Sequence, residues 1–237
     1  MRASRESVAA ALRSAYPAAS LSPGIGRYRH HYAEHGTAFW GEGLATGVEC
    51  FFTARPALRG ARVLDLGAGT GRHSFEAARR GADKVDAVEV DAVAGQFILE
   101  GSLRLEQAGI IPEGVIRLHS TDAVEYLHDT TAEYDVIICY GLLHVLSRDD
   151  VSSVLGDFER TLKTGGTLIL QLLTSKFAAP REQPELDDVW ISPDAAEHLL
   201  DSGPWDIWWH NDTDIRHSHI SSEDHQHGAQ RFIADRR

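Results

Sequence analysis

The segment Arg62-Val63-Leu64-Asp65-Leu66-Gly67-Ala68-Gly69-Thr70-Gly71-Arg72-His73 decides the fold of this 237-residue chain. Its branched apolar run predicts a strand buried on both faces of a sheet, and the alternate glycines predict a tight turn. Glycine tolerates positive φ and lets a ligand lie against the backbone. A helix expected over residues 72–80 then directs its free amide groups at that ligand. The segment therefore predicts a strand, a ligand-binding loop and a helix.

The glycine spacing selects between two kinds of nucleotide-binding loop. The dinucleotide fingerprint G-x-G-x-x-G would need a third glycine at the position of Arg72. The observed order, Asp65-x-Gly67-x-Gly69-x-Gly71, instead resembles the first motif of the class I S-adenosylmethionine (SAM)-dependent methyltransferases. The resemblance implies that the carboxylate and the loop hold the methionine end and the ribose of SAM, through Asp65, Gly67, Ala68, Gly69 and Gly71.

Two more carboxylates follow at the separations that this family shows. Glu89 ends the strand expected over residues 84–90, about 20 residues past the loop, where a carboxylate accepts hydrogen bonds from two ribose hydroxyls. The resemblance places Asp122 beside the adenine amino group, although Asp122 also suits the N-cap of a short helix. The remaining cofactor contacts that the resemblance implies are Val90, Ala123 and Cys139.

The ordered landmarks imply an α/β fold, a doubly wound seven-stranded mixed sheet of order 3-2-1-4-5-7-6 with helices on both faces. After the first two strands we expect strands over residues 115–118, 135–140 and 165–173. An antiparallel pair over residues 205–212 and 228–234 closes the sheet. The length fits one domain, residues 1–237, with a helical lid over residues 1–55 and a SAM-binding core over residues 60–237.

Composition excludes several classes of protein. Cys50 and Cys139 are the only cysteines, which argues for a reducing compartment and against a cysteine-rich zinc module or a radical-SAM cluster. No segment has the length of a secretory signal or of a membrane span, so we expect a cytoplasmic protein without membrane contact. The formal net charge of −12 repels phosphate backbones, which disfavours nucleic acid as the substrate.

The acceptor side of the site is predicted from two aromatic and histidine-rich segments. Residues 27–40 precede the first strand, and the resemblance implies that Tyr28, His31 and Trp40 fold over the cofactor. Packing of these aromatic side chains on the sheet is the alternative. The loop Tyr140-Gly-Leu-Leu-His144 resembles the tellurite-resistance and thiopurine-type branch, which methylates small molecules. It lacks the motifs of DNA, protein-amide and catechol methyltransferases.

Three residues of these segments are candidates for a catalytic role. His144 has an intrinsic pKa near neutrality and is the candidate general base, with Tyr140 and His31 as further candidates. Tyr28, Trp40, Tyr140 and His144 are the predicted acceptor-binding residues. A histidine that only lines the site is the alternative reading of His144.

Histidines are frequent near the C-terminus, at positions 210, 217, 219, 225 and 227. Neutral imidazoles suit zinc, iron or nickel, but no carboxylate or cysteine completes a ligand set at a typical spacing. We therefore expect no metal.

Together these features predict a SAM-dependent methyltransferase that acts on a small molecule through an O, N or S nucleophile and releases S-adenosylhomocysteine (SAH). We expect the small-molecule acceptor as the binding partner, and the protein as a monomer or a homodimer. A non-catalytic SAM-binding helper on the same scaffold is the alternative.

Overall fold

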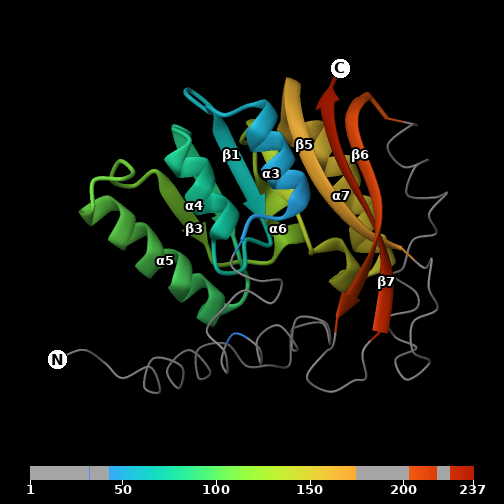
Figure 1. Cartoon of the computed structure of the whole chain (residues 1–237), viewed down its shortest axis with the longest axis horizontal. Helices are drawn as coiled ribbons and strands as arrows, with labels where there is room; N and C mark the ends of the chain where they lie inside the picture. Colours follow the sequence, from blue (N-terminus) through green and yellow to red (C-terminus); the bar gives the residue numbers. More distant parts are fainter. Residues whose placement is uncertain (1–31, 33–42, 175–202, 218–224) are drawn as a thin grey trace.

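The computed structural model describes residue 32 and residues 43–174, 203–217 and 225–237. Its strands form one seven-stranded sheet of order β3-β2-β1-β4-β5-β7-β6 with helices on both faces (Figure 1). This order confirms the predicted fold class. The strands are β1 (Arg62–Leu66), β2 (Lys84–Val88), β3 (Ile116–His119), β4 (Tyr134–Cys139), β5 (Leu162–Thr174), β6 (Trp205–His217) and β7 (His225–Arg236).

The first five strands run parallel, and β7 pairs antiparallel with both β5 and β6. The connecting helices are α3 (Thr46–Ala54), α4 (Arg72–Arg79), α5 (Ala92–Gln107), α6 (Ala123–Asp129), the 3₁₀ turn η2 (Leu143–Val145) and α7 (Arg148–Thr161). The carboxyl ends of the parallel strands therefore meet along one edge, which is where ligands of open α/β sheets bind.

The sheet separates two apolar cores. Helices α3, α4 and α5 cover one face, where Phe51 and Ile98 pack against Val63 and Ile138. Helices α6 and α7 cover the other face, where Leu127 joins the second core. The strands are apolar on both faces, as their runs of branched apolar residues predict, so a core on each face of the sheet keeps them out of water.

Side-chain caps fix where the helices begin near the carboxyl edge. Asp91 accepts hydrogen bonds from the amides of Val93 and Ala94 at 2.9 and 3.0 Å and so starts α5. Asp122 caps α6 in the same way, which confirms the capping role expected for it. Both caps lie directly after a strand and set the direction in which the chain leaves the sheet.

The C-terminal hairpin is longer than predicted. We expected strands over residues 205–212 and 228–234, with the histidines between them or at their ends. Pairing instead continues to His217 and His225, which are register partners. Backbone hydrogen bonds extend the strands through a polar stretch that lacks the apolar alternation used to place their ends. The sequence also predicts a loop over residues 174–188, from its two prolines and mixed charge, and a helix over residues 194–200 that begins after Ser192-Pro193; both lie almost wholly outside the described residues.

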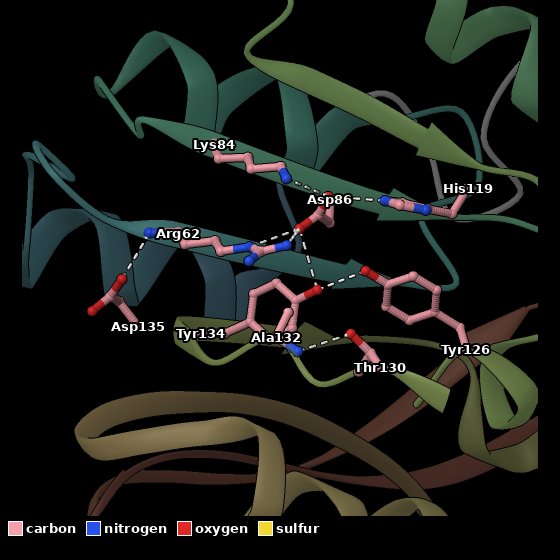
Figure 2. Close-up of polar contacts among 9 residues, drawn as sticks. All are labelled: Arg62, Lys84, Asp86, His119, Tyr126, Thr130, Ala132, Tyr134 and Asp135. Carbon is pink, nitrogen blue, oxygen red and sulfur yellow. Dashed lines mark hydrogen bonds and ion pairs between the residues drawn. The ribbon is translucent and has the colours of Figure 1, made fainter. Parts of the chain in front are cut away.

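A buried polar network joins four strands to α6 (Figure 2). Asp86 on β2 is fully buried and accepts hydrogen bonds from Arg62 at 2.6 and 2.9 Å. It also contacts the His119 ring at 2.8 Å and the Tyr134 hydroxyl at 3.2 Å. The Tyr134 hydroxyl lies 2.6 Å from that of Tyr126 on α6. The contacts with His119 and Arg62 hold the pKa of Asp86 below its ordinary value despite burial.

The network fixes α6 relative to the sheet. Because α6 begins at the carboxyl edge, its first residues are held beside the glycine loop.

Within the described ranges, no helix has the length and apolar character needed to cross a bilayer.

Candidate active site

The glycine loop adopts the conformation that its sequence predicts. Gly67, Gly69 and Gly71 have φ values of 69°, 57° and 85°, which side chains rarely adopt. A Cβ at Gly69 would lie 3.0 Å from the Tyr32 hydroxyl. A Cβ at Gly71 would instead lie 2.9 Å from Ile98, so the absence of a side chain there serves packing of the loop against α5.

Glu89 lies against this loop with both carboxylate oxygens engaged. Oε2 accepts a hydrogen bond from the Gly69 amide at 2.7 Å, and Oε1 accepts one from the Asp91 amide at 2.8 Å. Burial raises the pKa of Glu89 to about 7, although the two amides oppose the shift. Each carboxylate oxygen has a second acceptor position, so the group retains capacity for two hydroxyl donors.

A cleft of about 860 Å³, counted out to its open mouth, lies over the loop and Glu89. Eight of the predicted site residues line it, namely Gly67, Ala68, Gly69, Glu89, Val90, Asp122, Ala123 and Tyr140. The other lining residues are Tyr32, Thr70, Arg72, His73, Val88, Asp91, Thr121, Gly141, Leu142, Val145 and Leu146.

Asp65 lies beneath the loop and does not line the cleft. It is 2% exposed and accepts a hydrogen bond of 2.6 Å from the Ser74 hydroxyl at the start of α4. Burial raises its pKa to about 6. Asp65 therefore positions the loop and the helix start from beneath the loop. Cys139 and Gly71 also lie outside the cleft lining.

His73 faces the cleft beside Tyr140, and the two rings meet edge to face at 6.0 Å. Burial lowers the pKa of His73 to about 3, so the ring is neutral and its 4.0 Å approach to Asp65 is no ion pair. Its Nε2 accepts a hydrogen bond from the Ala45 amide at 3.3 Å. This arrangement makes His73 a poor proton acceptor and a structural part of the cleft wall.

His144 lies in the middle of η2, directly after the buried Leu143. Leu142 and Val145 face the cleft, and His144 does not contribute to its lining. The Tyr140 hydroxyl is buried, and burial raises the pKa of Tyr140. The predicted base thus borders the site and does not project into the described part of it.

Several predicted residues fall outside the part of the chain that the structure describes: Tyr28, His31, Trp40 and His219. Tyr32, which sequence reasoning did not select, occupies the cleft from the same aromatic segment. Among the C-terminal histidines, His210 stacks on Phe232 at 4.5 Å. The described residues contain no group of three or more His, Cys, Asp or Glu side chains arranged to hold a metal ion.

Comparisons with known proteins agree with this geometry. Residues 63–166 match the family described as a methyltransferase domain. The chain is 31% identical over 144 residues to a tRNA U34 carboxymethyltransferase of Trichlorobacter lovleyi, covering 57% of this chain and 41% of that protein. The chain thus spans less than half of that curated relative.

Solved structures share the fold at low sequence identity. TehB from Haemophilus influenzae superposes with a TM-score of 0.67 at 15% identity, covering 89% of this chain and 67% of that chain. The magnesium protoporphyrin IX methyltransferase ChlM from Synechocystis PCC 6803, crystallised with bound SAM, gives a TM-score of 0.59 at 17% identity. It covers 100% of this chain and 99% of that chain.

The family match covers β1, its glycine loop, Glu89 and the strands that border the cleft. The sheet order and the superpositions extend the same fold to the C-terminal hairpin. Residues 63–166 therefore match the methyltransferase domain family, and the sheet order is that of the class I methyltransferase fold.

Proposed function

We propose that this protein transfers the methyl group of SAM to a small-molecule acceptor and releases SAH. One observation carries the proposal: the Glu89 carboxylate lies against the positive-φ glycine loop, inside the cleft, with two acceptor positions unused. That arrangement suits the adjacent hydroxyls of a ribose. Asp122, Ala123 and Val90 line the same cleft and suit the adenine end.

SAM, when bound, supplies a methyl group already activated by the sulfonium charge. The chain therefore has to align the acceptor and exclude water, with the nucleophile about 3 to 3.5 Å from the methyl carbon. Tyr140, Leu142 and Leu146 border the carboxyl edge where the transferred group would lie. A general base is needed only where the acceptor arrives protonated. For that case we propose His144, with Tyr140 and His31 as further candidates.

A small acceptor is favoured by charge and by the cleft. The net charge of −12 opposes binding of a polyanion. The cleft combines apolar walls with few polar groups, as small-molecule sites do. The curated relative modifies tRNA according to its name, so tRNA is the macromolecular acceptor to test first.

We further propose a cytoplasmic protein that works as a monomer or homodimer, with residues 1–55 as a lid that carries Tyr28 and Trp40 to the acceptor. Tyr32 supports this assignment, because its hydroxyl lies at the Gly69 backbone inside the cleft. A non-catalytic SAM-binding helper is the second candidate, since it would use the same loop and Glu89.

Incubation with methyl-labelled SAM and a metabolite panel, with tRNA as a separate arm, tests the proposal. We expect SAH release and label in a small molecule, with neither in a Glu89→Ala variant. Tight SAM binding without SAH release for any acceptor would favour the helper. Label in tRNA alone would contradict the small-molecule acceptor.

A further inference from the structure

The strand register brings four polar side chains into one row at the carboxyl edge of the sheet. Arg231 on β7 is the register partner of Gln171 on β5 and of Asn211 on β6. Ile138 pairs with Ile169, so Tyr140, two residues further, lies level with Gln171. The row therefore runs Tyr140, Gln171, Arg231, Asn211, across β4, β5, β7 and β6.

The row marks an abrupt change from an apolar to a polar surface. The adjacent row, two residues away on each strand and further from the carboxyl edge, consists of Ile138, Ile169, Ile233 and Trp209, all packed in the core beneath α3. Side chains two positions apart on a strand share a face, so the polar row continues this face beyond the core. It begins at Tyr140, which lines the cleft above the glycine loop.

Two donors in the row are buried without partners among the described residues. Neither the Tyr140 hydroxyl nor Arg231 Nε makes a hydrogen bond to another described residue. A buried polar group left unpaired costs roughly 1 to 3 kcal/mol. Gln171, only 7% exposed, adds a further amide beside them. A ligand with acceptor atoms would satisfy these groups.

The charge of the row indicates which acceptor atoms fit. Arg231 donates through Nη1 to the neutral Asn211 side chain at 3.2 Å, and no described carboxylate forms an ion pair with it. Its positive charge is strong enough at Tyr140 to oppose the rise in the pKa of that phenol. A guanidinium binds a carboxylate through two parallel hydrogen bonds, and a phenol donates a third.

We propose that the methyl acceptor is an organic acid whose carboxylate binds to Arg231 and Tyr140. This inference rests on the proposed function, because the row borders the cleft in which SAM would lie. The carboxylate anchors one end of the acceptor, and the acceptor nucleophile then faces the methyl group across the carboxyl edge. Arg231 and Tyr140 thus determine specificity for the acceptor.

Matched pairs of ligands test the charge requirement directly. We would titrate SAH-saturated protein by calorimetry with benzoate and benzamide, 4-hydroxybenzoate and 4-hydroxybenzamide, anthranilate and anthranilamide, and with phenyl phosphate. We expect at least one carboxylate to bind about tenfold or more tightly than its amide. Arg231→Gln should abolish that preference and leave amide binding and SAH binding unchanged.

Two further variants separate loss of charge from loss of structure. Arg79→Gln removes an exposed arginine on α4, and we expect it to keep the preference. Arg231→Lys keeps the charge without the planar fork and should weaken carboxylate binding about threefold to tenfold, a readout that stays available if Arg231→Gln does not fold.

The proposal fails if no carboxylate binds more tightly than its amide, if phenyl phosphate is preferred to every carboxylate, or if Arg231→Gln keeps the preference. A protein that binds no SAH would contradict the proposed function itself, which separates the two failures.

Discussion

Glu89 makes binding of the cofactor nucleoside dependent on pH. Its carboxyl group has a pKa of about 7 in the folded protein, and the ordinary value is 4.5. Ribose hydroxyls donate to the ionised carboxylate, so binding strengthens as pH rises through 7. The ionised fraction is about 0.1 at pH 6 and about 0.9 at pH 8, which predicts about tenfold weaker binding at the lower pH.

The probe should contain the ribose and no titratable amino acid, because SAM and SAH carry an amino group of their own. 5′-Methylthioadenosine meets this requirement, and calorimetry at pH 6, 7 and 8 measures its affinity. Glu89→Gln should bind it more weakly, by roughly 1.5 to 3 kcal/mol at pH 8, and without pH dependence. Equal affinity of the wild type at pH 6 and pH 8 would refute the reasoning. So would a Gln variant that keeps the dependence.

The same shift has a consequence for stability without ligand. A carboxyl whose pKa is raised on folding holds its proton more tightly in the folded state, so stability falls as pH rises from about 4.5 to about 7. The full shift corresponds to about 3 kcal/mol. Urea unfolding of the wild type and of Glu89→Gln across this range should show the steeper decline in the wild type, because Asp65, whose pKa is also raised, contributes to both proteins. Parallel curves would contradict the raised pKa.

Four other outcomes are expected. Gly69→Val should abolish nucleoside binding, since a side chain strains a φ of 57° and collides with the Tyr32 hydroxyl before it reaches a ligand; calorimetry detects the loss. If His144 is the general base, His144→Ala should lower kcat by about 10² to 10⁴, whereas His128→Ala, at an exposed histidine, should leave kcat unchanged. A His144→Ala variant with unchanged kcat from pH 6 to 9 would exclude that role. Asp86→Asn should destabilise the protein by about 3 kcal/mol in urea unfolding, because Arg62 loses its buried partner; a change under 1 kcal/mol would show that the network is not stabilising. Chelator treatment should leave activity unchanged and elemental analysis should find no bound metal, whereas a metal lost together with activity would overturn that expectation.

Local sequence predicts the strands well in this chain, and the resemblance to class I methyltransferases implies their order. The apolar runs of β1, β2 and β4 are buried on both faces, and a run of that kind has few other structures open to it. Glu89 and the glycines were predicted because the loop and the following strand specify their positions through short-range geometry. The hairpin ends were placed too early because backbone pairing there does not need apolar side chains.

The cleft was predicted less completely, for reasons of packing and register. Strand alternation and the Ser74 hydroxyl hold Asp65 beneath the loop, a position that the spacing of the motif alone does not specify. Tyr32 belongs to the same aromatic segment as the predicted residues, and its sequence neighbours offer no signal that would single it out. Arg231 lies 91 residues from Tyr140 in the numbering, and only the register of β4, β5 and β7 places them in one row.

The position of β7 between β5 and β6 determines the order in which the sheet can assemble. The β6–β7 hairpin forms through contacts close in sequence, whereas β5 ends at Thr174 and its partner Gly228 lies more than 50 residues later. Closing such a long loop is entropically costly before docking rewards it. We therefore expect the five parallel strands and the hairpin to form separately, and the sheet to grow from five strands to seven in one docking step. Until that step the edge of β5 has unpaired backbone groups, which makes this strand the site of greatest risk for intermolecular pairing during folding.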